Sequence, residues 1–231
     1  MKEHAMACSY YNLIMMRLNK FLASVGVSSR RGADRLIENA LVTINGKVAK
    51  LGDKVTGKEK ILVDGQEIKT AEDKEYIMLY KPVGIVSTAS DEIGRQNVVD
   101  LVKSKNRLYP VGRLDKNSEG LILLTNDGEL ALRLTHPKFH LEKEYEVECD
   151  RNIFKNKIKV GINKIIWAEK NKMKIVMYEG KKRQIREMCW KAGLRVKILK
   201  RIRIGDLKIG DLTPGQSRHL TAQEVSELKR L

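Results

Sequence analysis

A short acidic turn leads directly into an apolar run near the middle of the chain, and this junction constrains the fold more than any other segment. Asp115 stands in the charged sequence Gly-Arg-Leu-Asp-Lys, and the apolar run Leu121–Leu124 follows it between Gly120 and an Asn-Asp-Gly sequence. A short apolar run bounded by turn residues predicts a buried strand. Asp115 is therefore expected on rigid scaffold, which suits a reacting carboxylate because such groups must be closely positioned. The alternative is an aspartate that only caps a turn.

Basic residues are concentrated in one part of the chain. The net charge is +16, and residues 151–205 contain 18 Lys or Arg but only three acidic residues, Glu169, Glu179 and Glu187. A concentrated basic block is typical of proteins that bind polyanions such as nucleic acid. A solvated lysine-rich surface is the simpler explanation of a short charge run, but apolar periodicity continues through this long one.

Cysteine usage and hydropathy exclude several classes of protein. Cys8, Cys149 and Cys189 are odd in number and widely separated, which supports neither a disulfide framework nor a cysteine-based zinc site and predicts a cytoplasmic protein. No apolar stretch reaches the ~18 residues of a membrane span, so no membrane partner is expected. Residues 1–15 lack the features of a signal peptide and are interpreted as a disordered N-terminal extension.

A pair of histidines imitates a metal site. His136 and His140 are spaced as on one face of a helix, but Pro137 follows the first of them and opposes that helix. No metal site is therefore predicted.

Residues 16–68 have the pattern of a small α+β module. Two amphipathic helices are predicted, the second capped by Ser28 or Ser29. Their expected inner faces are Leu18, Phe21, Leu22 and Val25 in the first helix and Ala33, Leu36, Ile37 and Ala40 in the second. Asn45-Gly46 and Asp64-Gly65 each predict a hairpin with a type I′ turn.

The polar residues 69–75 are interpreted as a linker, and residues 76–231 as a second domain. A strand is predicted at Tyr76–Tyr80, and Lys81 stands at the corner that Pro82 imposes after it. Residues 85–88 are expected to resume as a strand, and residues 89–94 to form a loop.

Two further segments of this domain contribute candidate site residues. In Lys143–Cys149 the alternation is strict, so Tyr145 is expected to point inward, either as a core residue or to stack on a planar ligand. A helix is predicted to begin near Gln184, with Arg183, Arg186 and Trp190 on a flank away from its apolar face. Its basic groups could hold phosphates or pair with a buried carboxylate.

Residues 16–68 resemble the S4 RNA-binding domain. The motifs that carry the resemblance are Arg-Leu-Asn-Lys-Phe-Leu from Arg17, Gly-Val-Ser-Ser-Arg-Arg from Gly26 and Val-Thr-Ile-Asn-Gly from Val42. The resemblance implies that Lys20, Arg30, Arg31 and also Lys47 meet structured RNA, mostly through phosphates and shape.

From Met16 to the C-terminus the chain resembles a ribosomal RNA pseudouridine synthase of the RsuA type. The motifs are Lys-Pro-Val-Gly from Lys81, Gly-Arg-Leu-Asp with Leu-Thr-Asn-Asp-Gly, Lys-Glu-Tyr from Lys143, and Glu-Gly followed by Arg-Gln-Ile-Arg. In detail the sequence after Asp115 is most similar to the branch called RluF, whose members act on large-subunit RNA. The implied fold is α+β, with an S4 module and a catalytic domain around a mixed, largely antiparallel sheet flanked by helices.

The resemblance also implies a mechanism without a cofactor. The target uridine is flipped out of the RNA, and Asp115 acts as nucleophile or base to start cleavage of the glycosidic bond. Tyr145 is expected to stack on the base, Arg186 to pair with Asp115, and Arg113 to fill the gap that the flipped nucleotide leaves. Further substrate contacts are expected from Lys81, Arg183 and Gln184.

Two other functions are weighed against this one. A ribosome-associated S4 protein without catalysis would not need Asp115, Tyr145 and Arg186 together. A glycosidase-like hydrolase would need a second carboxylate, and none is placed to partner Asp115. The expectation is therefore a monomeric enzyme that acts on ribosomal RNA, whose target uridine the sequence does not identify.

Overall fold

The computed structural model describes residues 15–68, 73–91, 93–161 and 163–230. These residues fall in two compact units, divided between Asp73 and Lys74. Apart from Met15, the extension expected at residues 1–15 lies outside the described residues, as do residues 69–72 of the expected linker.

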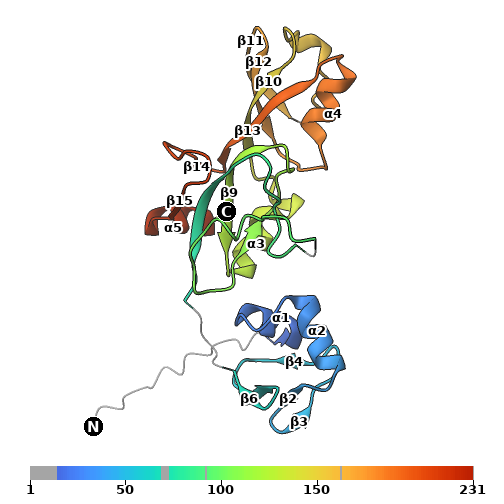
Figure 1. Cartoon of the computed structure of the whole chain (residues 1–231), viewed down its shortest axis with the longest axis vertical. Helices are drawn as coiled ribbons and strands as arrows, with labels where there is room; N and C mark the ends of the chain where they lie inside the picture. The colour runs from blue at the N-terminus through green and yellow to red at the C-terminus, as the bar shows by residue number, and fades with distance from the viewer. Residues whose placement is uncertain (1–14, 69–72, 92, 162, 231) are drawn as a thin grey trace, which may run out of the picture. The chain divides into compact units, whose positions relative to one another are not determined.

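The smaller unit contains two helices and short strands (Figure 1). The helices are α1 (Leu18–Ser24) and α2 (Arg30–Glu38), and the strands are β1 (Met16–Arg17), β2 (Val42–Ile44), β3 (Lys47–Val48), β4 (Lys54–Val55), β5 (Ile61–Val63) and β6 (Gln66–Glu67). A four-stranded sheet has the order β3-β2-β5-β6, and β1 pairs with β4. Asn45, Gly46, Asp64 and Gly65 all have positive φ, which confirms the type I′ character of both hairpin turns.

The core of this unit is formed by the predicted helix faces with one exception. Ser29 caps α2 by accepting a hydrogen bond from the Gly32 amide at 3.0 Å, and Ala33 and Ile37 are buried beneath the helix. Ala40, expected on the same inner face, is instead exposed. The reason is that α2 ends at Glu38 and Ala40 takes a left-handed conformation, with φ at 56°.

The larger unit is built on a nine-stranded sheet whose main path runs β11-β12-β10-β13-β9-β7-β15. The bounds are β7 (Tyr76–Lys81), β8 (Tyr109–Val111), β9 (Glu119–Thr125), β10 (Lys143–Cys149), β11 (Lys164–Glu169), β12 (Lys172–Met177), β13 (Val196–Ile204), β14 (Leu207–Lys208) and β15 (Ser217–His219). The β9–β13 pair is parallel and the other strand pairs of the sheet are antiparallel. The expected mixed, largely antiparallel sheet is thus confirmed.

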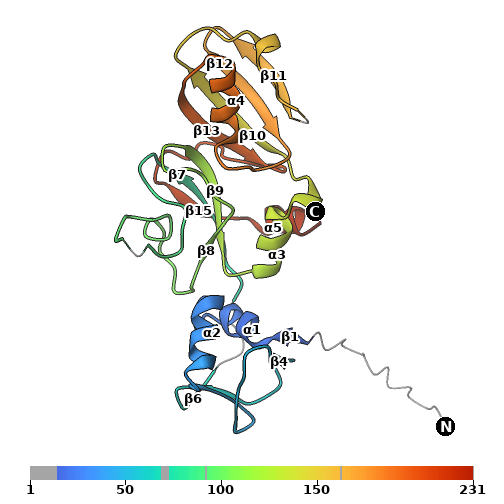
Figure 2. The ribbon, with the colours of Figure 1, turned by 90° about the vertical axis from the view of Figure 1, so that its right-hand side faces the viewer.

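Both faces of strand β9 are covered, which explains its uninterrupted apolar sequence. Leu121 and Leu123 pack with α3 (Gly128–Thr135) and α5 (Ala222–Arg230), whereas Ile122 and Leu124 pack beneath the segment between β7 and β8. Asp127 caps α3 by accepting from the amides of its first turn. Helix α4 (Gln184–Lys191) packs on the β10–β13 half of the sheet in both views (Figures 1 and 2).

The segment between β7 and β8 departs from the prediction. Residues 85–88 form no regular strand; Val86 makes only an isolated bridge to Asn97. In this segment the Ser87 side chain, rather than a strand ladder, makes the contact with the neighbouring chain: its hydroxyl bonds both the carbonyl and the amide of Leu114. Two short 3-10 helices, Pro137–Phe139 and Lys155–Lys157, complete the unit.

The two halves of the large sheet meet at a short parallel junction. Only Glu119 and Gly120 of β9 pair with Lys200 and Arg201 of β13. Gly120 has a φ of +105°, and a Cβ atom at this position would overlap the carbonyl oxygen of Arg201 and lie 2.6 Å from its amide nitrogen. The junction therefore requires glycine.

Candidate active site

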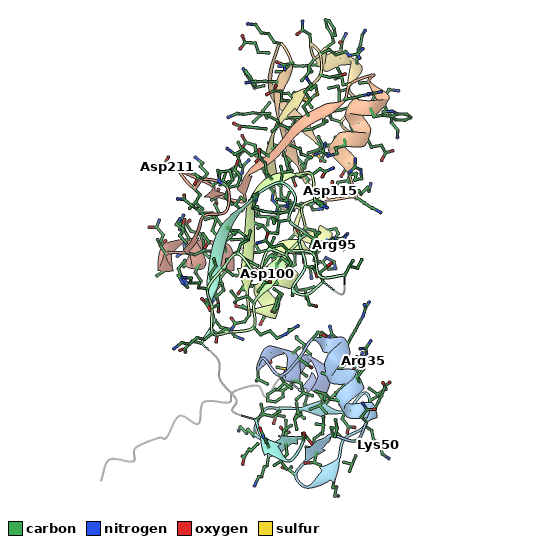
Figure 3. All side chains as sticks on the ribbon, viewed as in Figure 1. Arg35, Lys50, Arg95, Asp100, Asp115 and Asp211 are labelled. Carbon is green, nitrogen blue, oxygen red and sulfur yellow. The ribbon has the colours of Figure 1, made fainter. Side chains whose placement is uncertain are left out.

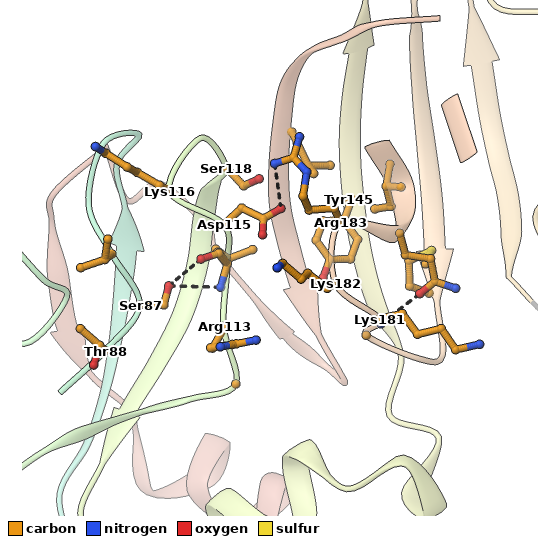
Figure 4. A pocket seen from close by; sticks show the side chains of 18 of the residues that line it. Ser87, Thr88, Arg113, Asp115, Lys116, Ser118, Tyr145, Lys181, Lys182 and Arg183 are labelled. Carbon is orange, nitrogen blue, oxygen red and sulfur yellow. Dashed lines mark hydrogen bonds and ion pairs between the residues drawn. The ribbon is translucent and has the colours of Figure 1, made fainter. Parts of the chain in front are cut away.

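A cleft of about 610 Å³ in the larger unit contains the acidic residue that the sequence singled out. Asp115 lies in the loop between β8 and β9, facing Tyr145 of β10 and the loop that precedes α4 (Figure 4). The two halves of the sheet thus contribute opposite walls of one cleft.

The loop that bears Asp115 is held through its backbone. Ser87 donates its hydroxyl to the Leu114 carbonyl at 2.9 Å and accepts from the Leu114 amide at 3.1 Å (Figure 4). The Gly84 amide donates to the Lys116 carbonyl at 2.8 Å, and the Ser118 amide donates to the Asp115 carbonyl at 2.9 Å. These bonds hold the loop through its backbone, and the Asp115 side chain lines the cleft.

The carboxylate of Asp115 is 31% exposed and forms an ion pair with Arg183, with 4.0 Å between Nη1 and Oδ2 (Figure 4). The sequence predicted Arg186 as its partner, but no ion pair joins these two residues within the described part of the chain. Arg183 takes this place because it adopts a left-handed conformation, φ 55°, immediately before α4.

Arg186 instead holds the Asp115 loop by hydrogen bonds to Asn117 and Ser118. Its Nη2 donates to the Asn117 carbonyl at 2.6 Å and to Ser118 Oγ at 3.3 Å, and its Nη1 donates to the Val196 carbonyl at 3.1 Å. Burial, together with Arg183, lowers the pKa of the Arg186 guanidinium, whereas Asp115 acts to raise it. Arg186 therefore connects α4, β13 and the Asp115 loop without contacting the carboxylate directly.

Lys81 occupies a different position from the one predicted. It was expected to contact substrate, but its side chain is 0% exposed and does not line the cleft. The residue ends β7 opposite Gly120, so the strand carries it into the interior. Its ammonium donates to the carbonyls of Ser118, at 2.7 Å, and Pro82, at 2.9 Å. Burial lowers the pKa of Lys81 to about 8, against the opposing effect of Glu119 and Asp115.

The other predicted residues of this domain also line the cleft. Tyr145 is half-buried, packs against the core beneath α4 and faces the cleft with one side. Arg113 and Arg183 are exposed at its rim. Gln184, expected to bind substrate, uses its amide within its own loop: it donates to Glu179 at 2.6 Å and accepts from the Lys181 amide at 3.2 Å.

Several cleft residues were missed by the sequence reasoning. Ser87 was assigned to a strand, and nothing in its local sequence indicates that it holds a distant loop. Asp91 and Arg95 line the cleft as an ion pair of 2.7 Å, and hydrogen bonds from Arg95 lower the pKa of Asp91 to about 2. Their i, i+4 spacing in the sequence could have indicated this ion pair. Arg95 and Asp115 are both labelled in the larger unit in Figure 3.

The residues expected to bind RNA in the smaller unit are all accessible. Lys20 lies on α1, Arg30 and Arg31 begin α2, and Lys47 begins β3; each is exposed. Arg35 on α2 and Lys50 after β3 add further basic side chains to this unit (Figure 3).

The two histidines of the apparent metal motif do not share a helix. His136 follows the end of α3, and His140 follows a 3-10 helix in a left-handed conformation. Within the described ranges, no three His, Cys, Asp or Glu side chains are grouped to hold a metal ion, and no helix is long and apolar enough to cross a membrane.

Comparison with protein families matches both units. Residues 16–61 match the S4 domain, and residues 75–170 match the RNA pseudouridylate synthase family.

Relatives cover nearly the whole chain. The chain is 38% identical to the ribosomal large subunit pseudouridine synthase B of Bacillus subtilis (strain 168), over 94% of this chain and 97% of that protein. It is 41% identical to the dual-specificity RNA pseudouridine synthase RluF of Escherichia coli (strain K12), over 94% of this chain and 79% of that protein. A crystal structure of a pseudouridylate synthase superposes with a TM-score of 0.66 at 28% identity, covering 92% of this chain and 99% of the other.

Proposed function

This chain belongs to the RNA pseudouridine synthase family and carries an S4 domain, and from that premise we propose that it converts a specific uridine of large-subunit ribosomal RNA to pseudouridine with Asp115 as the catalytic carboxylate. The names of the relatives support the substrate class. The alternative of a catalytically inactive S4 protein is not favoured, because the carboxylate, the tyrosine and the arginines meet in one cleft.

One observation carries the role of Asp115. Its loop is bonded from Ser87, Gly84, Lys81 and Arg186, yet its carboxylate remains 31% exposed in the cleft. A reacting group gains rate from such fixed placement, since misplacement by an ångström can reduce a rate by about 10²-fold.

In the proposed reaction the uridine enters the cleft from the RNA fold, and RNA contacts offset the free energy of unstacking. Asp115 starts cleavage of the bond between N1 of the base and C1′ of the ribose. The freed base turns, a bond forms between C5 and C1′, the proton on C5 leaves to solvent, and N1 takes up a proton. The reaction is an isomerisation, so no co-substrate is consumed.

Neighbouring residues divide the remaining tasks. Tyr145 stacks on the base while it turns, because its ring faces the cleft from the opposite strand. Arg183, paired with Asp115, and Arg113 at the rim hold the RNA backbone beside the flipped nucleotide. Lys20, Arg30 and Arg31 of the S4 unit supply sequence-independent phosphate contacts. We propose that the enzyme acts as a cytoplasmic monomer.

The test is release of tritium from transcripts of large-subunit RNA labelled at uridine C5. Wild type is expected to release tritium, and Asp115→Asn is expected to release none above background. Asp211→Asn is the matched control, because the same change is made at an exposed carboxylate of the same unit. Absence of release by wild type would refute the proposed function, and normal release by Asp115→Asn would refute the assignment of Asp115.

A further inference from the structure

A second hollow, of about 510 Å³, lies along helix α4 beside the active-site cleft. We call it the α4 groove and define it by Lys182, Arg183, Arg186, Trp190, Leu194 and Arg195. Neither the proposed chemistry nor the core of the unit accounts for the most unusual member, Trp190.

Trp190 is 71% exposed, although its helix has an apolar face that packs on the sheet. The indole stands on the opposite flank, near the end of α4. A large exposed aromatic ring among cations is poorly placed to contribute to folding, but it is well placed to stack on a nucleic-acid base.

The charge of the α4 groove favours a polyanion. Lys182, Arg183 and Arg195 supply three exposed cations, and Arg186, which is hydrogen-bonded within the protein, adds a fourth positive charge. The single acidic member of the lining, Glu187, forms an ion pair with Lys191 at 2.7 Å. An aromatic ring flanked by basic side chains is the combination with which proteins bind unpaired nucleotides.

The α4 groove adjoins the active-site cleft. Lys182 and Arg183 line both hollows, and Arg183 is the residue that pairs with Asp115. A strand whose target uridine occupies the cleft can therefore continue past Arg183 to Trp190 without leaving the basic surface.

We propose that the α4 groove binds an unpaired nucleotide that neighbours the target uridine in the substrate RNA. Its base stacks on Trp190, and Arg195 and Lys182 hold the adjoining phosphates. This inference rests on the proposed function, since it assigns the nucleotide to the same RNA whose uridine reacts at Asp115. It makes the enzyme selective for uridines beside a bulge, loop or strand end rather than within an uninterrupted duplex.

Binding is tested by tryptophan fluorescence in the full chain. The chain has two tryptophans, so Trp167→Phe leaves Trp190 as the sole indole. The probes are a single-stranded 12-nucleotide oligouridylate and a blunt-ended RNA duplex of the same length. The single strand is expected to quench Trp190 emission strongly, because the bases stack on the ring, and the duplex is expected to quench it little.

Substitutions separate stacking from general basic attraction. Trp190→Ala is expected to weaken oligouridylate binding about tenfold, within the range for loss of one base–aromatic stack, and Trp190→Phe to retain most of the affinity. Phe154→Ala is the matched control: Phe154 is another exposed aromatic beside a lysine, outside the α4 groove. Equal quenching by duplex and single strand, or unchanged affinity of Trp190→Ala, would overturn the proposal.

Activity assays distinguish this proposal from the proposed function. With large-subunit transcripts, Trp190→Ala is expected to raise KM about tenfold and to change kcat less than twofold. If wild type releases no tritium, the proposed function fails. The fluorescence titration then still shows whether the α4 groove binds single-stranded RNA at Trp190. If wild type is active and Trp190→Ala has a normal KM, the α4 groove proposal alone fails. A concentration-dependent dimer that Trp190→Ala abolishes, without RNA quenching, would assign the surface to a second copy and likewise overturn it.

Discussion

Replacement of Gly120 by alanine tests the junction on which the site depends. The backbone at Gly120 has a φ of +105°, which an L-residue adopts only with strain of about 1–3 kcal/mol. The added methyl group would also overlap the carbonyl oxygen of Arg201 and lie 2.6 Å from its nitrogen. Both atoms belong to backbone, so no side-chain rotation relieves the overlap.

Relief requires β13 to move away from β9, which breaks the short parallel ladder between them. Overpacking of a rigid interior typically reduces stability by about 1–3 kcal/mol. With the strain, the expected loss is about 2–6 kcal/mol, a large part of the 5–15 kcal/mol that stabilises a typical domain.

Two glycines of the same unit serve as matched controls. Gly215 has a φ of +88° but nothing within 4 Å of an added Cβ, so Gly215→Ala should show strain alone, about 1–2 kcal/mol. Gly180 has open space and no positive φ, so Gly180→Ala should change stability by less than about 0.5 kcal/mol.

The measurement is urea unfolding followed by tryptophan fluorescence. Both tryptophans lie in the larger unit, so the smaller unit does not contribute to the signal. Gly180→Ala is expected to be the most stable of the three variants, Gly215→Ala intermediate and Gly120→Ala the least stable. If Gly120→Ala loses no more stability than Gly215→Ala, the close approach of β9 and β13 does not limit the fold and the reasoning is wrong.

Three further predictions concern cations around the cleft. Because burial lowers the pKa of Lys81 to about 8 from an ordinary 10.5, its charge destabilises the fold below pH 8, and this penalty is relieved as the pH rises toward 10.5. Relative to Lys81→Met, wild type should therefore gain up to about 3 kcal/mol of unfolding free energy between pH 7 and pH 10, and parallel pH profiles in calorimetry would contradict this. Arg186→Lys should lower kcat about 10²-fold with little change in KM, because one ammonium cannot keep the two bonds to the Asp115 loop and the bond to Val196 of β13. A rise in KM alone in steady-state assays would assign Arg186 to RNA binding instead. Arg95 is exposed in the cleft and is expected to hold one phosphate, so Arg95→Ala should reduce the slope of log affinity against log salt by about one in filter binding. An unchanged slope would exclude that contact.

Local patterns in the sequence predicted several elements and the side of the sheet on which Tyr145 lies. Turn dipeptides predicted both hairpins of the smaller unit, and the apolar run after Gly120 predicted β9. Alternation in β10 predicted the direction of Tyr145, because a strand has a strict period of two. These features depend only on residues that are close together in the sequence, so a single sequence is enough to predict them.

Contacts between segments that lie far apart in the sequence could not be predicted from local patterns. The burial of Lys81 depends on β7 being covered on both faces, and a lysine at a strand end is usually exposed. The choice of Arg183 over Arg186 as partner of Asp115 depends on a left-handed backbone at Arg183, which its sequence does not require. Ser87 acquires its role only when the loop at Leu114 folds against it.

In the proposed reaction, the residues that hold the Asp115 loop differ from those that would contact RNA. Lys81, Ser87 and Arg186 each donate hydrogen bonds to backbone carbonyls of the Asp115 loop or its neighbours, which holds these three side chains in place. Arg183 is exposed, and its Nη1 lies 4.0 Å from Oδ2 of Asp115, a long distance for an ion pair. A phosphate entering the cleft can therefore draw Arg183 from Asp115 without disturbing the loop.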